Sequence, residues 1–207
     1  DNLSFFDAVV HISKVVGIDL EYEEKSGFNF KEDENTHLIQ EILYEAKVYY
    51  QSCLKQAPNA LAYFQSRGLS PQVIDQFSLG FAPESFDLLT VLRKKFNRDD
   101  LLIRSGLFNQ SDDGRMYARF FDRIMFPIQD QRGRTVGFGG RILTDSKKTA
   151  KYINTQETEL FQKRRLFYGL NVAKQSINKS KNVILMEGYM DVLLAHQNGF
   201  DINKISN

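Results

Sequence analysis

The strongest constraint on the fold comes near the end of the chain, at residues 182–191 (NVILMEGYMD). Its apolar run, Val183–Met186, predicts a buried β-strand that ends directly in Glu187 and Gly188. Open parallel sheets place their chemistry just beyond the carboxyl ends of the strands. The Glu187 carboxylate, beside a glycine that lets a ligand approach closely, is therefore placed to bind a hard divalent cation or to act as an acid or base. Asp191, at the start of a predicted helix, is a second candidate.

The charges are distributed unevenly along the chain. Residues 1–91 hold 6 Lys and Arg against 14 Asp and Glu, whereas residues 92–181 hold 20 against 9. Residues 182–207 hold 1 against 3, and the net charge of the whole chain is only +1. A basic segment of this kind is typical of a surface that binds a polyanion. A solvated basic face is the alternative that charge alone leaves open.

Composition excludes several classes of protein. The chain has 207 residues, of which 42% are hydrophobic, and this is ordinary for a soluble globular protein of one or two domains. A single cysteine, Cys53, excludes an internal disulfide and a Cys-rich zinc site. No apolar run is long enough for a signal peptide or a membrane span. We therefore expect a cytoplasmic protein with no membrane partner, present here as a piece of a longer chain.

Hydrophobic spacing predicts a largely helical first half and a sheet in the second half. Helices are predicted from Ser4 to Val16, from Thr36 to Pro58, over 59–66 and from Pro71 onward, with an acidic linker at 21–35. After Gly106, two apolar runs flank the turn Asp130–Arg134 and predict a β-hairpin. Residues 144–165 are expected to form a polar, basic surface loop, followed by a helix at 170–177.

Candidate ligand-binding residues lie in this second half. The glycines of Gly137–Gly140 fit neither the Walker pattern nor the dinucleotide fingerprint, so we interpret them as allowing a tight strand exit. Arg141 follows them and is placed to meet a phosphate. In the stretch 151–165, Lys and Arg can hold phosphates, Asn154 can read a base edge or sugar hydroxyl, and Tyr152 can stack on a base. A solvated loop would have a similar composition.

Arg119 and Arg123 form another candidate pair. On a strand, positions 119, 121 and 123 share one face, so the two arginines would project together. Ion pairing of either one with Asp122 or Asp130 is the alternative.

Four segments, in this order, resemble the bacterial replicative DNA primases. They are Tyr63–Ala82 (YFQSRGLSPQVIDQFSLGFA), Arg119–Leu143 (RFFDRIMFPIQDQRGRTVGFGGRIL), Lys151–Leu170 (KYINTQETELFQKRRLFYGL) and Asn182–Gly199 (NVILMEGYMDVLLAHQNG). The resemblance covers nearly the whole chain, and several long motifs in series are highly specific, whereas EGYMD alone would not be. Gln156 replaces the proline that is usual in the family, without affecting the charged groups.

The resemblance implies part of an RNA polymerase core that synthesises short RNA primers on single-stranded DNA for replication. The implied fold is of the α+β or α/β class: a mixed helical-and-sheet N-terminal subdomain followed by the start of a Toprim domain, which is Rossmann-like. We expect an N-terminal helix and linker at 1–35, the basic subdomain at 36–180 and the truncated Toprim start at 181–207.

The resemblance also implies the roles of individual residues. Glu187 corresponds to the Toprim glutamate, with a metal or acid–base role, and we add Asp191 as a second catalytic candidate. Mg²⁺ or Mn²⁺ would need further carboxylates from a later Asp-x-Asp motif, which we expect outside this chain. The positions that match the family's nucleotide and template contacts are Arg67, Arg141, Lys151, Tyr152, Asn154 and Lys163, to which we add Arg119 and Arg123.

The implied partners are a single-stranded DNA template, an RNA primer and nucleoside triphosphates, within the bacterial replisome. A zinc ribbon, which would hold the only zinc, and the domain that binds the replicative helicase are expected outside this chain. Two alternatives stay open: a non-catalytic platform that binds nucleic acid and nucleotides, and another Toprim enzyme such as a nuclease or topoisomerase. The primase-like segments upstream of residue 182 argue against the second alternative.

Overall fold

The computed structural model describes residues 30–84, 87–144, 149–200 and 202–205. Contacts divide the chain into residues 1–33 and one compact unit, residues 34–207, and the second unit is the subject below. The helix predicted from Ser4 to Val16 and most of the predicted linker lie outside the described residues. The predicted boundary between residues 180 and 181 lies within the second unit and stays a prediction. No helix in the described ranges is long and apolar enough to cross a membrane.

The helices largely follow the sequence prediction. They are α2 (Phe30–Lys55), α3 (Pro58–Ser66), α4 (Pro71–Gln76), α5 (Asp87–Phe96), α6 (Asp99–Arg104), α7 (Leu170–Ser180), α8 (Tyr189–Gln197) and a short 3₁₀ helix, η2 (Lys163–Arg165). The predicted start of the long helix at Thr36 is wrong, because α2 already begins at Phe30. The start at Ser70 is confirmed, since its hydroxyl accepts a hydrogen bond from the Val73 amide at 3.4 Å.

A four-stranded antiparallel sheet forms the centre of the unit. Its strands, in spatial order, are β1 (Gly80–Ala82), β4 (Arg123–Gln129), β5 (Thr135–Ile142) and β6 (Tyr152–Asn154). The predicted hairpin is confirmed as β4 and β5. The prediction of one loop over 144–165 is wrong in part, because Tyr152–Asn154 pair with Gly139–Arg141 as an edge strand.

Two smaller sheets complete the strands. One pairs β2 (Phe108–Gln110) with β3 (Met116–Ala118), and the other has the order β7 (Phe167–Tyr168), β9 (Ile202–Ile205), β8 (Ile184–Met186). In the second sheet β8 runs parallel to β9, as expected for the start of an α/β arrangement.

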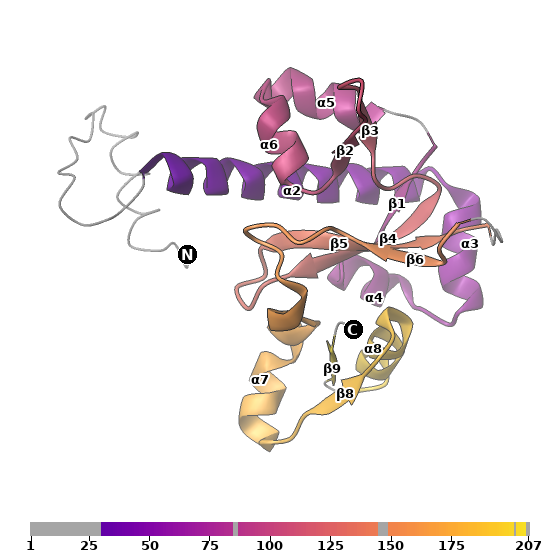
Figure 1. The fold of residues 1–207 in the computed structure, drawn as a ribbon. Helices are drawn as coiled ribbons and strands as arrows, with labels where there is room; N and C mark the ends of the chain where they lie inside the picture. The colour runs from indigo at the N-terminus through magenta and orange to yellow at the C-terminus, as the bar shows by residue number, and fades with distance from the viewer. Residues whose placement is uncertain (1–29, 85–86, 145–148, 201, 206–207) are drawn as a thin grey trace, which may run out of the picture. The chain divides into compact units, whose positions relative to one another are not determined.

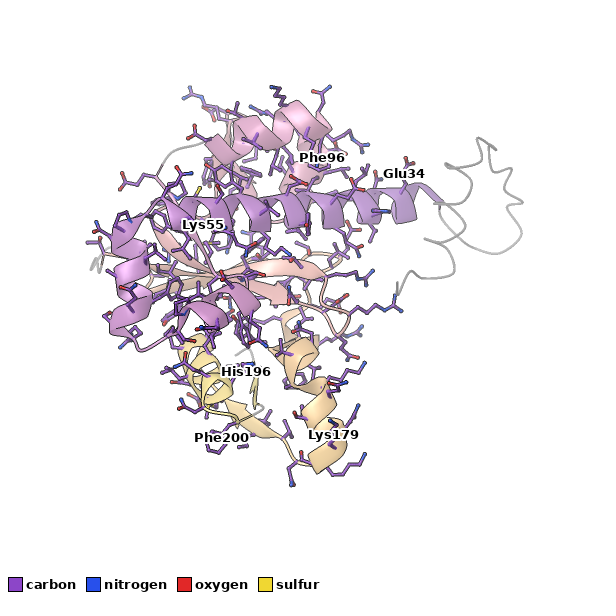
Figure 2. All side chains as sticks on the ribbon, turned by 180° about the vertical axis from the view of Figure 1, so that it is seen from behind. Glu34, Lys55, Phe96, Lys179, His196 and Phe200 are labelled. Atoms are coloured by element: carbon purple, nitrogen blue, oxygen red, sulfur yellow. The ribbon has the colours of Figure 1, made fainter. Side chains whose placement is uncertain are left out.

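Helices cover both faces of the central sheet (Figure 1). Alternate residues of β4 face opposite sides: Phe126 packs in a cluster with α3, α4 and α8, while Met125 packs in a cluster with α2, α5 and α6. Seen from behind, α2 runs along the sheet from Glu34 to Lys55 (Figure 2). Because both faces are buried, the β4 sequence is a continuous apolar run rather than an alternating one.

The predicted burial of Val183–Met186 is wrong. A strand is present, but Ile184 is 45% exposed and Leu185 is 50% exposed. Among the described residues β8 hydrogen-bonds to β9 alone, so it is an edge strand with little covering its side chains. The apolar run that is typical of a buried strand therefore forms an edge strand, β8, whose apolar side chains are exposed.

Candidate functional site

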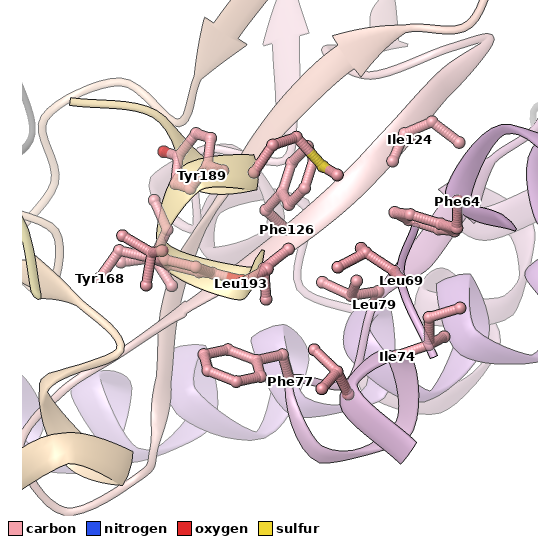
Figure 3. Packing of buried hydrophobic residues seen from close by; sticks show 14 of the residues in the cluster. Phe64, Leu69, Ile74, Phe77, Leu79, Ile124, Phe126, Tyr168, Tyr189 and Leu193 are labelled. Carbon is pink, nitrogen blue, oxygen red and sulfur yellow. The ribbon is translucent and has the colours of Figure 1, made fainter. Parts of the chain in front are cut away.

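One aromatic ring connects the central sheet to the segment after β8. Phe126, Gly139 and Asn154 are neighbours across β4, β5 and β6. The Tyr189 ring, from the first turn of α8, stacks on Phe126 with a centroid distance of 4.8 Å and an interplanar angle of 8° (Figure 3). Its hydroxyl donates to Asn154 Oδ1 at 2.8 Å. The residues that follow Glu187 are thus anchored on the sheet.

The glycines of β5 make room for rings. A Cβ atom at Gly139 would lie 2.6 Å from the Tyr189 ring, and one at Gly137 would lie 2.9 Å from the Phe161 ring. On the opposite face, a Cβ at Gly140 would lie 2.7 Å from Phe120. The interpretation of these glycines as a strand exit is therefore wrong, because they lie inside β5 and each one accommodates an aromatic side chain.

A cavity of about 620 Å³ lies over this junction. It brings together side chains from three separate stretches of the chain. Among the residues lining it are Arg119, Tyr152, Asn154, Lys163, Glu187 and Tyr189. Two of the candidate cations, Arg119 and Lys163, thus share one cavity with the Asn154 amide and the Glu187 carboxylate.

Hydrogen bonds order the wall that β6 contributes to this cavity. Arg119 Nε donates to the Asn154 carbonyl oxygen at 2.8 Å. Thr155 is buried, and its hydroxyl accepts from the Phe138 amide at 2.8 Å, which extends the pairing of β6 with β5. Glu157 accepts a bond from the Lys163 amide at 3.1 Å. The edge strand is therefore held in place on the side that faces the cavity.

Two arginines and two tyrosines form a second cluster next to the cavity. The Arg141 guanidinium carbon lies 4.5 Å from the centre of the Tyr63 ring, and that of Arg67 lies 5.8 Å from it. Burial raises the pKa of the Tyr152 phenol, and the neighbouring Tyr63 raises it further. The positive charges of Arg141 and Arg67 lower this pKa and so offset part of the rise. Arg141, which the sequence places in or beside a polar, exposed loop, belongs to β5, and it is only 6% exposed.

Arg123 is buried and holds backbone together. Its guanidinium donates to the carbonyl oxygens of Gly140 and Ala150, each at 3.1 Å. The expectation that Arg119 and Arg123 project from one strand is wrong. β4 begins only at Arg123, and Asp122 before it has a φ of 47°, which turns the chain.

Lys151 and Asp191 lie outside the cavity wall. Lys151 is exposed at the start of the segment that leads into β6. Asp191 is exposed in the first turn of α8, where a carboxylate is favoured, and its side chain folds back against Gly188. Arg67 is within electrostatic range of Asp191. The structure thus brings Glu187, but not Asp191, to the cavity.

The acidic side chains present do not make a complete metal site. Glu157 and Glu187 both line the cavity. However, no group of three or more His, Cys, Asp or Glu side chains that could hold a metal ion occurs in the described part of the chain. Mg²⁺ and Mn²⁺ prefer several oxygen ligands, so these residues alone do not fit either ion.

Comparison with known proteins identifies the family of this chain. Residues 49–174 match the family described as DNA primase catalytic core, N-terminal domain. The chain belongs to this family of DNA primases. It is 40% identical over 207 residues to the DNA primase of Haemophilus influenzae, covering 97% of this chain but 34% of that protein. The chain therefore spans about a third of the length of that curated relative.

Solved primase structures share the fold. A DnaG primase catalytic domain bound to ssDNA matches with a TM-score of 0.73 and 38% identity, over 84% of this chain and 57% of that one. The Aquifex aeolicus primase, with its zinc-binding and RNA polymerase domains, matches with a TM-score of 0.79 and 31% identity, over 99% of this chain and 48% of that one.

Sequence reasoning missed Tyr63 and Tyr189 as parts of the candidate site. Both lie inside the segments that carried the resemblance, Tyr63 four residues before Arg67 and Tyr189 two residues after Glu187. The four-residue spacing on one helix was a usable signal for the Tyr63–Arg67 contact. The pairing of Tyr189 with Gly139 joins residues far apart in the sequence, and no local pattern indicates it.

Proposed function

We propose that this chain is part of the RNA polymerase core of a DNA primase, which makes short RNA primers on single-stranded DNA. The reaction would be nucleotidyl transfer: a 3′-hydroxyl oxygen gives up its proton to water and forms a bond to the α-phosphorus of a nucleoside triphosphate, and pyrophosphate leaves with the electrons of the broken P–O bond. The observation that carries this proposal is the shared cavity, where Arg119, Lys163 and Asn154 lie together with Glu187.

Each cavity residue has a role that follows from its chemistry. Arg119 and Lys163 supply positive charge for phosphate oxygens, and a cation held in place by the protein stabilises charge that develops in the transition state. Tyr152 is 41% exposed and can offer part of its ring to a base. Arg67, which is exposed and lies over the Tyr63 ring, would extend the positive surface for a template backbone, and the buried Arg141 adds positive charge on the same ring.

A divalent cation, Mg²⁺ or Mn²⁺, remains part of the proposal for the longer protein. When bound, it would neutralise the triphosphate, with Glu187 as one ligand. The other ligands would have to come from phosphates or from residues outside the described ranges. A catalytic role of Asp191 also stays a prediction. So do the zinc ribbon and the helicase-binding domain that we expect outside this chain.

The absence of a three-ligand acidic group within the described residues favours a second candidate for this chain by itself. Alone, it would act as a platform that binds nucleotides and single-stranded nucleic acid without catalysis. The two candidates agree on binding and differ in catalysis. The nuclease or topoisomerase alternative has less support, because the relative reported above is a DNA primase.

Binding and synthesis should be measured separately. For binding, a labelled oligodeoxynucleotide is titrated with residues 1–207 at several salt concentrations. Affinity should fall steeply, with a log–log slope of about −0.7 for each phosphate neutralised on a single strand. Lys163→Ala should weaken binding and reduce this slope, whereas Lys55→Ala, at the exposed end of α2, should leave both nearly unchanged.

For synthesis, the same variants are placed in a primase in which this chain continues through the rest of the catalytic core. Lys163→Ala should lower primer synthesis at least about tenfold, as expected for loss of a charge-assisted phosphate contact. Robust template-dependent synthesis by residues 1–207 alone would exclude the platform candidate. Failure of the oligonucleotide to bind at low salt would contradict both candidates.

A further inference from the structure

We propose that Tyr189 is a positioning residue that fixes the side-chain amide of Asn154, so that Asn154 offers its Nδ2 hydrogens, and not its oxygen, to a bound nucleotide. This inference rests on the proposed function and assigns a role within the same cavity. Tyr189 itself acts through Asn154 and does not have to touch the nucleotide.

The direction of the hydrogen bond is the first argument. The Tyr189 hydroxyl donates to Asn154 Oδ1 at 2.8 Å, so the amide oxygen is occupied on the side of α8. A planar amide that directs its oxygen to one neighbour turns its NH₂ group away from that neighbour. Burial raises the pKa of the Tyr189 phenol, and the charge of Tyr152 adds to this, so the hydroxyl stays a donor at neutral pH.

The rigidity of Tyr189 is the second argument. The residue is only 2% exposed, lies face to face with Phe126, and meets the Tyr168 ring edge-on at a centroid distance of 4.8 Å. Gly139 leaves the space that the ring fills. A donor held on three sides can select one orientation of a partly exposed amide.

The backbone of Asn154 is fixed independently of its side chain. Arg119 Nε donates to its carbonyl oxygen, and β6 pairs Asn154 with Gly139. With the backbone fixed by β6 and the amide oxygen by Tyr189, the remaining freedom of Asn154 is small. A pre-oriented donor in a cavity with Arg119 and Lys163 fits an acceptor oxygen of a nucleotide, such as a phosphate oxygen.

The test uses a pair of matched variants in residues 1–207. Tyr189→Phe removes the hydroxyl and keeps the ring. Tyr168→Phe is the control, because the buried Tyr168 hydroxyl has no hydrogen-bond partner among the described residues and its ring touches that of Tyr189. The affinity for ATP, measured by calorimetry, should fall about three- to tenfold in Tyr189→Phe, the loss expected for one hydrogen bond, and stay unchanged in Tyr168→Phe.

A double-mutant cycle separates positioning from general support of the fold. If Tyr189 acts through Asn154, then Tyr189→Phe should cost no further affinity in an Asn154→Ala background. Equal losses in both backgrounds, or an unchanged affinity of Tyr189→Phe, would overturn the proposal. The cycle alone therefore distinguishes positioning of Asn154 from general support of the fold.

A ligand-independent measurement keeps this inference apart from the proposed function. In NMR spectra of the free protein, Tyr189→Phe should shift the Asn154 side-chain NH₂ resonances and speed their exchange with water, while Tyr168→Phe should not. If wild-type protein does not bind ATP but this NMR difference is present, the proposed function fails and the positioning contact stands. If the NH₂ resonances are the same in all three proteins, the positioning contact is wrong even if ATP binds.

Discussion

The guanidinium of Arg141 lies over the ring of Tyr63, with 4.5 Å between the guanidinium carbon and the ring centre. The contact joins the end of strand β5, where Arg141 lies, to helix α3, where Tyr63 lies. Arg141 also donates through Nη1 to the Ile142 carbonyl oxygen at 2.9 Å. A residue that the sequence presents only as a phosphate ligand therefore also takes part in the packing of the subdomain.

Arg141→Ala should lower both ligand affinity and stability. A buried, stacked guanidinium contributes packing and hydrogen bonds as well as charge, so we expect a loss of about 1–3 kcal/mol in the free energy of unfolding. Urea denaturation followed by circular dichroism measures it. Lys151→Ala is the contrasting variant: its side chain is exposed, and its unfolding free energy should stay within about 0.5 kcal/mol of wild type. Equal stability of the two variants would contradict the packing role of Arg141.

Arg123→Met should affect stability before it affects any ligand. The side chain is only 2% exposed and donates to carbonyl oxygens of β5 and of the segment before β6. Methionine fills part of the volume but leaves these carbonyls without their donor, at a cost of about 2–4 kcal/mol. Urea unfolding gives the loss directly. If Arg123→Met keeps wild-type stability and instead weakens oligonucleotide binding, the original assignment of Arg123 to template contact is correct.

Ile184→Ala should be mild in this chain, in spite of the apolar pattern around it. Because the Ile184 side chain is 45% exposed, its truncation leaves no closed cavity, and we expect a loss below about 1 kcal/mol. Leu193→Ala on α8 is the matched comparison. Leu193 is 0% exposed in the core cluster and should cost about 2–5 kcal/mol. Thermal unfolding of the two variants, measured side by side, would disprove the exposed-edge description if the order were reversed.

Asp122→Asn should stabilise the protein at neutral pH. Burial raises the pKa of the Asp122 carboxyl, the charge of Glu84 adds to this, and Arg123 opposes it. A raised folded-state pKa favours folding only while the group is protonated, and this contribution is lost as the pH rises through the folded pKa. The charged form is thus unfavourable at pH 7, and Asn also tolerates the positive φ of this position.

The expected gain from Asp122→Asn is below about 1 kcal/mol at pH 7, because the side chain is only partly buried. Urea midpoints should converge with those of wild type below about pH 4, near the ordinary pKa of an Asp carboxyl. A gain that is the same at pH 7 and pH 3.5 would assign the effect to backbone conformation alone.

The elements that could be predicted are those fixed by local chemistry. Ser70 and Pro71 determine the start of α4, and the turn at 130–134 joins the hairpin of β4 and β5. What escaped prediction depends on tertiary neighbours. The strand β6 lies in a stretch with the composition of a loop, and it forms because Thr155 and Asn154 find partners on β5 and α8. Burial of β8 was overestimated, since an apolar run does not reveal which other elements cover it.

The candidate site followed the same division. Residue types with the right chemistry were recognisable from the sequence, and the cavity gathers Glu187, Asn154 and Lys163. The sequence could not distinguish an arginine that faces a ligand from one that supports the backbone, as Arg123 does. That distinction depends on where the strand begins, and strand boundaries depend on pairing partners far away in the chain.

The glycine at position 139 limits how this part of the protein can evolve. Any side chain there would occupy the space of the Tyr189 ring, so positions 139 and 189 cannot change independently. A library that randomises Gly139 alone should return almost only glycine, whereas one that randomises both positions should recover larger residues at 139 together with smaller ones at 189. These two positions, far apart in the sequence, are thus expected to change only together.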